Sequence, residues 1–164
     1  MRIGKEYNQQ ELADLQKTAV LDKAMMRSLD YLARRPRSEW EVRDYLRRKE
    51  YDSPTIDTIL SKLSNYGYID DVKFAQAWVS NRRLLKPTSL RRLRQELAQK
   101  HVSREDVEKA LEDDEGDESI VLLELIQKKQ QQSRYQDQQK LIAYLLRQGF
   151  NYSDVKAALE TEEA

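Results

Sequence analysis

Apolar residues recur along the chain at a spacing that is repeated three times. In the first segment they are Val42, Leu46, Tyr51, Ile56 and Leu60, with successive offsets of 4, 5, 5 and 4 residues. The same offsets separate Leu93, Leu97, Val102, Val107 and Leu111, and again Leu141, Leu145, Phe150, Val155 and Leu159. Steps of four place side chains on one helix face, and steps of five fit a turn between helices. The pattern predicts a pair of short helices in each segment.

Polar residues suited to begin a helix recur at matching positions. A Ser, Asp or Asn side chain can accept hydrogen bonds from the unpaired backbone N–H groups of the first helical turn. Glu41 follows a serine by three residues, which is the spacing of a capping box. We expect caps for the first helix of each pair at Ser38, Ser89 and Asp137, and for the second helix at Asp52, Ser103 and Asn151.

A further stretch of helical character precedes each segment, at residues 22–35, 71–84 and 118–132. Asn8 and Glu11 have the spacing of another capping box and predict a helix within the first part of the chain. A short helix cannot bury its apolar stripe alone, so the three helices of each unit must pack together. The sequence therefore predicts an all-α fold of three tandem three-helix repeats.

Units of this kind stack on their neighbours along the chain. We expect an elongated, curved array, that is, a superhelix whose hand the pattern leaves open. The predicted parts are an N-terminal helical extension and three repeats, the last of which carries an acidic tail. Their limits are 1–21 for the extension and 22–69, 70–114 and 115–164 for the repeats.

Composition agrees with helices and narrows the possible chemistry. Charged residues make up 35% of the 164 residues, with only four glycines and three prolines. The absence of cysteine excludes disulfides, thiol nucleophiles and Cys-ligated zinc, and His101 is the only histidine. His101 falls in a predicted turn, where we expect a structural or exposed role. No long apolar run or signal peptide is present. We therefore expect a cytoplasmic protein without a metal, a cofactor or a membrane contact.

The charges are sorted along the chain although the formal net charge is zero. Residues 82–94 contain six basic side chains and no acidic one, whereas residues 112–118 are almost all acidic. A basic segment of this kind can attract phosphate groups or an acidic protein surface. The more common alternative for any one charge run is a solvated helix face.

Two adjacent aspartates, Asp70 and Asp71, lie between the first two repeats. Gly67 suits the left-handed conformation that ends a helix. With Asp70 as the next N-cap, Ile69 and Phe74 occupy the two positions of a hydrophobic staple. Negative charge in the first turn also suits the helix dipole. A metal or acid–base site needs further carboxylates or histidines at helical spacing, and none is evident nearby. The aspartates are interpreted as the start of a helix.

Three stretches of the chain resemble one protein family. They are GYIDD-x-x-FAxxW at residues 67–78, RPRSEWEVRDYL at residues 35–46 and RQGF at residues 147–150. The chain resembles the RecX family, small regulatory proteins of the bacterial RecA recombinase, from about Asp22 to Leu159. The resemblance implies tandem three-helix repeats and a protein that binds the groove or the growing end of the RecA–DNA filament. There it would inhibit ATP hydrolysis and strand exchange, as part of DNA recombination, DNA repair and the SOS response.

The chain departs from these relatives at two loops. Relatives often carry glycine near Lys86–Pro87–Thr88 and near Lys100–His101, and this chain has none at either place. The resemblance therefore does not define the geometry of these two loops.

Basic residues are the predicted contacts with the RecA filament. In the second repeat, the apolar positions of the helix after Ser89 turn Arg91 and Arg92 away from the core, with Arg94 at the flank. Such contacts are salt-sensitive whether the partner is protein or DNA. The predicted partner-binding residues are Arg82, Arg83, Arg91, Arg92, Arg94, Arg35, Arg37, Arg47 and Arg48.

Two other classes of function are weighed against a RecA regulator. Three-helix units resemble helix-turn-helix DNA-binding domains, but their third helices are neutral or acidic here, which disfavours reading of a DNA groove. An enzyme would need a phosphate loop, a metal cluster or a nucleophile–base pair, and none is visible. We expect a monomeric, non-enzymatic regulator with weak DNA contact. The alternative is a nonspecific DNA-binding or protein-interaction scaffold.

Overall fold

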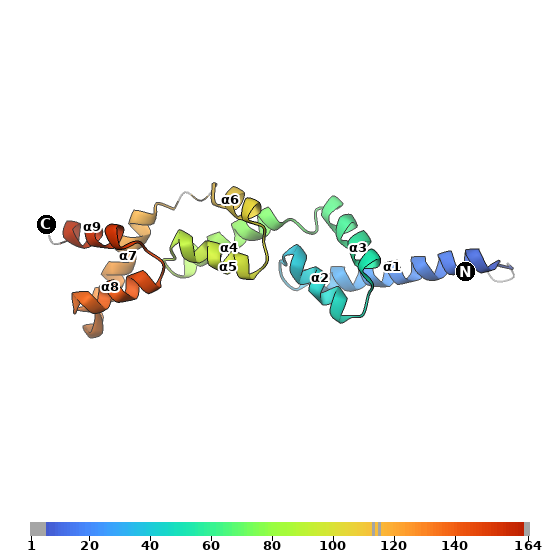
Figure 1. The fold of residues 1–164 in the computed structure, drawn as a ribbon, viewed down its shortest axis with the longest axis horizontal. Helices are drawn as coiled ribbons and strands as arrows, with labels where there is room; N and C mark the ends of the chain where they lie inside the picture. Colours follow the sequence, from blue (N-terminus) through green and yellow to red (C-terminus); the bar gives the residue numbers. More distant parts are fainter. Residues whose placement is uncertain (1–5, 113, 115, 163–164) are drawn as a thin grey trace. The chain divides into compact units, whose positions relative to one another are not determined.

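The computed structural model describes residues 6–112, 114 and 116–162. In these ranges it contains nine α-helices and a short 3-10 helix, η1 (Figure 1), which confirms the all-α prediction. The helices are α1 (Gln9–Ala33), α2 (Glu39–Arg48), α3 (Ser53–Asn65), α4 (Asp71–Leu85), α5 (Leu90–Gln99), α6 (Arg104–Glu112), α7 (Glu118–Gln130), α8 (Gln138–Arg147) and α9 (Tyr152–Glu162), with η1 at Ser133–Tyr135. None of the helices in the described part is long and apolar enough to cross a membrane.

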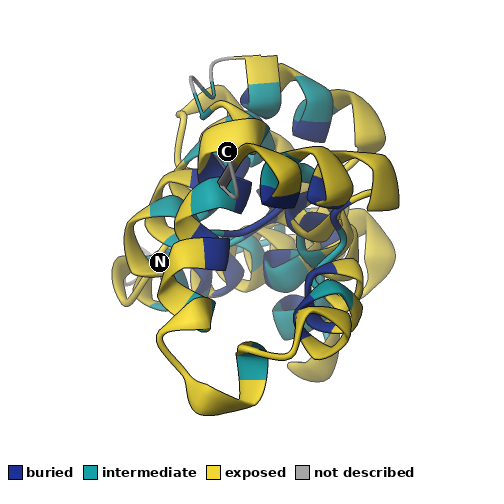
Figure 2. Cartoon of the chain, turned by 90° about the vertical axis from the view of Figure 1, so that its left-hand side faces the viewer, coloured by how far each residue is buried: buried dark blue, intermediate teal, exposed yellow. Residues whose placement is uncertain are grey.

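Each set of three successive helices has its own hydrophobic core. Val42 and Leu46 are fully buried in the core of α1–α3, Leu93 and Leu97 in that of α4–α6, and Leu145 in that of α7–α9. In most of the helices, buried residues follow one side and the opposite side is exposed (Figure 2). The chain divides into two compact units, Met1–Asp70 and Asp71–Ala164. The domain limits given above stay a prediction.

The helix starts are stabilised largely as expected. Capping boxes form between Ser38 and Glu41 and between Asn8 and Glu11. The other predicted caps that accept a backbone N–H are Asp52, Ser89, Ser103 and Asp137. Asn151 precedes α9 as predicted, but its side-chain amide donates a hydrogen bond to the Asp154 carboxylate at 3.3 Å.

The helix at the start of the chain is longer than expected. One continuous helix, α1, covers both the predicted extension and the first helix of the first repeat. Its sequence contains neither glycine nor proline, so nothing in the backbone interrupts it. Leu12 and Leu15, in its first half, are exposed.

The structure explains the repeated 4-5-5-4 spacing. At the end of α2, the Tyr51 N–H donates to the Leu46 carbonyl at 3.3 Å and the Glu50 N–H donates to the Arg47 carbonyl at 2.9 Å. This is a Schellman turn, in which Leu46 and Tyr51 make the accompanying apolar contact. Tyr51 also directly precedes the cap of α3, so it forms a hydrophobic staple with Ile56. One apolar side chain therefore joins two helices, and the same hydrogen bonds recur after α5 and α8.

A residue with positive φ follows each of these helices. It is Glu50 (φ 63°) after α2, His101 (φ 56°) after α5 and Gly149 (φ 98°) after α8. The loop at Lys100–His101 therefore keeps the left-handed geometry although it lacks glycine. Residues other than glycine, asparagine and aspartate rarely adopt this backbone conformation, because their Cβ atom approaches the following carbonyl oxygen.

Replacing Glu50 with glycine is expected to raise the free energy of unfolding of the first unit by up to about 1 kcal/mol. Removal of the Cβ relieves about 1–2 kcal/mol of left-handed strain, and the greater freedom of glycine in the unfolded chain offsets about half of that. Urea unfolding followed by circular dichroism measures the change. A variant less stable than the parent would show that Glu50 is not strained.

The aspartates between the first two repeats lie where a helix begins. Asp71 is the first residue of α4 and Asp70 precedes it. Ile69 belongs to the α1–α3 core and Phe74 to the α4–α6 core, and the staple between them stays a prediction. Trp78 packs against the α4–α6 core. Among the described residues, no group of three or more His, Cys, Asp or Glu side chains is arranged to hold a metal ion.

Candidate partner-binding surface

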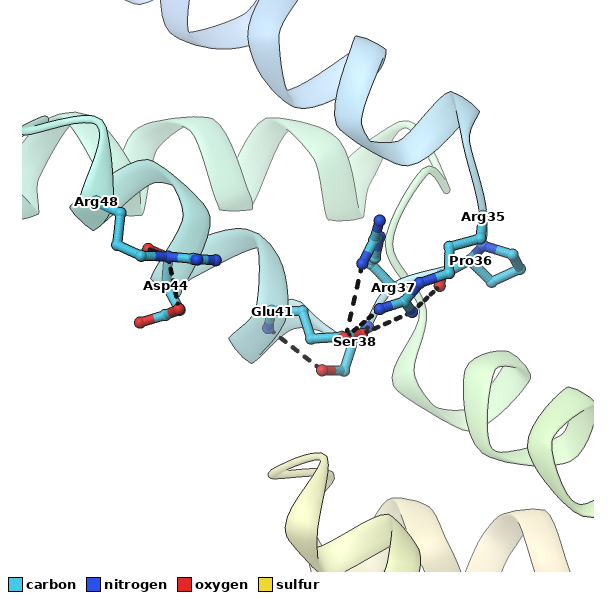
Figure 3. Close-up of polar contacts among 7 residues, drawn as sticks. All are labelled: Arg35, Pro36, Arg37, Ser38, Glu41, Asp44 and Arg48. Carbon is cyan, nitrogen blue, oxygen red and sulfur yellow. Dashed lines mark hydrogen bonds and ion pairs between the residues drawn. The ribbon is translucent and has the colours of Figure 1, made fainter.

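Two of the predicted arginines surround one glutamate at the start of α2 (Figure 3). Arg35 forms an ion pair with Glu41 at 2.7 Å, and this hydrogen bond raises the pKa of Arg35. Arg37 lies 3.9 Å from the same carboxylate, with its guanidinium 4.0 Å from the centre of the Tyr31 ring. The Arg37 side chain is only 13% exposed. Both side chains thus stabilise the turn that leads into α2.

Arg47 and Arg48 are exposed, with 69% and 65% of their side-chain area open to solvent. Both pair with Asp44, at 2.7 Å and 3.0 Å, and Figure 3 shows the Arg48 contact along one helix face. Exposed ion pairs of this kind contribute little to stability, so an anionic partner competes for these guanidinium groups at small cost.

In the second repeat, Glu96 neutralises part of the basic segment. Its carboxylate accepts hydrogen bonds from Arg82 at 2.8 Å and from the Trp78 indole at 3.0 Å, and lies 3.5 Å from Arg92. The Arg82 guanidinium also lies 5.2 Å from the centre of the Trp78 ring. These contacts join the end of α4 to α5.

Arg83 is a largely buried connection between segments. It donates to the Asp114 carboxylate at 2.7 Å and to the Thr88 carbonyl at 2.6 Å. The side chains of Arg83 and Asp114 are only 14% and 10% exposed. The pair holds the end of α4 against the loop before α5 and the segment after α6.

Arg94 faces the α6 helix. Its guanidinium makes two hydrogen bonds to Glu108, at 2.8 Å and 3.0 Å. This interaction raises the pKa of Arg94 and lowers that of Glu108, so both groups stay charged.

Arg91 differs from the others because it has no acidic partner among the described residues. It lines a small open cavity of about 150 Å³, here named the arginine notch. Arg91, Arg92 and Gln95 of α5 form one wall, and Leu146, Arg147 and Gly149 at the end of α8 form the other. Arg147 also lacks an acidic partner within the described ranges. The notch brings together guanidinium groups from two repeats.

A hydrogen bond between the repeats builds the notch. The buried Ser89 hydroxyl accepts from the Arg92 N–H at 3.2 Å and donates to the Gln148 carbonyl at 2.7 Å. The Leu90 N–H donates to Glu118 of α7 at 3.0 Å. A Cβ added at Gly149 would lie 2.7 Å from Ser89 Oγ. The start of α5 and the end of α8 are therefore in direct contact.

Sequence reasoning grouped nine arginines that the structure separates. Eight of them have an acidic partner among the described residues, and Arg91 does not. Arg147 was absent from the predicted set, since nothing in the sequence indicates that the end of α8 meets the start of α5. The role of the nine arginines in partner binding stays a prediction.

Comparison with known proteins identifies the family to which the three repeats correspond. Three family models match: the first three-helix domain of RecX at residues 24–63, the second at residues 70–111 and the third at residues 119–159. The regulatory protein RecX of Bacillus pumilus is 32% identical over 98% of this chain and 63% of its own length. That of Listeria monocytogenes is 28% identical over 94% of this chain and 60% of its own length. The chain thus spans somewhat under two thirds of these curated relatives.

Solved structures agree on the fold. A crystal structure of regulatory protein RecX covers 98% of this chain and 81% of its own, with a TM-score of 0.81 and 23% identity. The crystal structure of RecX from Lactobacillus salivarius covers 86% of this chain and 95% of its own, with a TM-score of 0.76 and 23% identity. With all three of its three-helix domains matched, the chain belongs to the RecX family of regulatory proteins.

Proposed function

We propose that this chain regulates a RecA-class recombinase by binding the RecA–DNA filament and inhibiting its ATP hydrolysis and strand exchange. It acts as a monomer in the cytoplasm and catalyses no reaction itself. Membership of the RecX family supports this function. The observation that carries the proposed site is that Arg91 and Arg147, which line the arginine notch, have no acidic partner among the described residues.

A filament on DNA offers closely spaced negative charge to a surface of this kind. Single-stranded DNA carries one phosphate per nucleotide, and each neutralised phosphate makes binding depend on salt. Arg91 and Arg147 need not leave an existing ion pair to bind such a partner. The paired arginines, by contrast, would first lose their carboxylate contacts.

Nonspecific DNA binding or a scaffold role is the alternative. A domain that reads a DNA groove is disfavoured by the third helices of the second and third repeats. These helices, α6 and α9, each carry more acidic than basic residues. A helix with net negative charge is repelled by the phosphates that border the major groove.

The test is RecA ATP hydrolysis on single-stranded DNA, with the chain added at substoichiometric and then equimolar amounts. The native chain is expected to inhibit hydrolysis. The double variant Arg91→Glu/Arg147→Glu is expected to inhibit at least tenfold more weakly, because two charges that face the filament change sign. Circular dichroism verifies that the variant stays folded.

The matched control is Lys128→Glu/Lys156→Glu, which makes the same change of charge at exposed positions of α7 and α9 outside the notch. Equal loss of inhibition in both double variants would reject the notch as the site. A folded native chain that leaves ATP hydrolysis unchanged would reject the function.

A further inference from the structure

The charges around the arginine notch do not balance. Arg92 shares the Glu96 carboxylate with Arg82, at 3.5 Å and 2.8 Å. Arg91 and Arg147 have no acidic partner in the described part of the chain. The nearby Glu118 carboxylate accepts the Leu90 N–H. The notch therefore carries excess positive charge on two helices that Ser89 holds together.

The helix ends themselves add little to this charge. The start of α5 has a partial positive charge and the end of α8 a partial negative one, and the two ends are in contact. Because these partial charges oppose each other, the guanidinium groups determine the local field. Guanidinium groups bind planar or tetrahedral anions through paired N–H donors.

The notch itself has room for one small group. Its volume is about 150 Å³, whereas sites for whole small molecules span roughly 300–1,000 Å³. It corresponds to the space of about five water molecules at roughly 30 Å³ each. A phosphate group fits such a space, and a complete nucleotide exceeds it.

We infer that the arginine notch binds one backbone phosphate of a nucleic-acid strand. Along α5, Arg91, Arg92 and Gln95 form a row without an acidic side chain, so a strand can continue past the notch. Leu146 is 39% exposed on the opposite wall and offers an apolar surface to a sugar or base. Contacts of this type bind DNA independently of its sequence.

This inference rests on the proposed function, since it assigns the DNA strand of the filament to the notch. The notch is also expected to bind a strand in the absence of RecA. The isolated chain is expected to bind a strand through Arg91 and Arg147, with Arg94 staying paired to Glu108.

The experiment measures binding of a fluorescent thymidine oligonucleotide to the isolated chain by anisotropy, at several salt concentrations. Arg91→Gln and Arg147→Gln are each expected to weaken binding about tenfold, the loss typical of a hydrogen bond between charged groups. The double variant is expected to reduce the salt slope by about 0.7, the value for one phosphate on a single strand. Lys128→Gln, outside the notch, is the control and is expected to bind as the native chain does.

Two competitors separate the possible sources of negative charge. Inorganic phosphate and polyglutamate are added at the same charge concentration as unlabelled oligonucleotide. Displacement only by the oligonucleotide supports the inference. Equal displacement by inorganic phosphate would replace the strand with a free anion, and equal displacement by polyglutamate would indicate an acidic protein partner. Equal weakening by Lys128→Gln would show general charge attraction.

RecA ATP hydrolysis, measured in parallel, distinguishes failure of the phosphate site from failure of the proposed function. If the native chain inhibits RecA but binds no oligonucleotide, the phosphate site is rejected and the proposed function stands. If the notch variants lose oligonucleotide binding while the native chain does not inhibit RecA, the site stands and the function is rejected.

Discussion

Replacing Asp114 with alanine is expected to lower the free energy of unfolding of the α4–α9 unit by about 3 kcal/mol. Removing one partner of a buried ion pair leaves the other charge without compensation, which costs about 3–5 kcal/mol. Arg83 is 14% exposed, so water offsets part of this loss. Its Nη1 donor keeps the Thr88 carbonyl, but its Nε atom already has no partner. Urea unfolding followed by circular dichroism measures the difference.

Glu105→Ala is the control for this ion pair. Glu105 and Lys109 pair at the same 2.7 Å as Arg83 and Asp114, but the glutamate is 77% exposed. Its removal is expected to leave the stability almost unchanged, because water screens the pair. The double variant Arg83→Met/Asp114→Leu is expected to recover most of the loss, since no buried charge remains. Equal effects of Asp114→Ala and Glu105→Ala would show that burial does not govern the pair.

Gly149→Ala is expected to destabilise the same unit by about 2–4 kcal/mol. The left-handed conformation accounts for about 1–2 kcal/mol, of which the lower freedom of alanine in the unfolded chain offsets about half. The rest comes from the new Cβ, 2.7 Å from Ser89 Oγ. The hydroxyl cannot move away freely, since it is buried and hydrogen-bonded to Gln148 and Arg92. Overpacking of this kind typically costs about 1–3 kcal/mol. Thermal and urea unfolding both report the change.

Gly67→Ala separates the two contributions. Gly67 has a φ of 75°, but nothing lies within 4 Å of a Cβ placed there. Only the backbone strain of about 1–2 kcal/mol is expected, and the lower freedom of alanine in the unfolded chain offsets about half of it. A Gly149→Ala variant no less stable than Gly67→Ala would mean that the contact with Ser89 yields at no cost. Crystallography of the variant would then show a shifted Ser89.

The fold was predictable because local interactions define each repeat. The caps at Ser38 and Ser89 use side chains within three residues of their targets. The apolar pairs Leu46–Tyr51 and Tyr51–Ile56 belong to a turn and a staple that the chain forms with itself. Spacing alone is enough to identify such features. The continuity of α1 was not predicted, because the expected boundary between residues 21 and 22 falls inside a helix that contains no glycine or proline.

The arrangement of the arginines was not predictable in the same way. Arg83 and Asp114 are 31 residues apart, and Ser89 and Gln148 are 59 apart. Contacts between residues so far apart in the sequence depend on how helices and repeats pack. The local spacing of residues does not indicate that packing. The basic segment was identified correctly as a segment. Which of its arginines are paired and which line the open notch depends on how α4, α6 and α8 pack around α5.

The three left-handed turns have a consequence for the ancestry of the repeats. If the repeats arose by duplication, their turns began with the same residue and have since diverged to Glu50, His101 and Gly149. The first two show that the turn forms without glycine. The glycine at position 149 is therefore required by the contact with the neighbouring serine in addition to the strain of its own turn. Of the three positions, position 149 is expected to have become the least tolerant of substitution once the third repeat packed against the second.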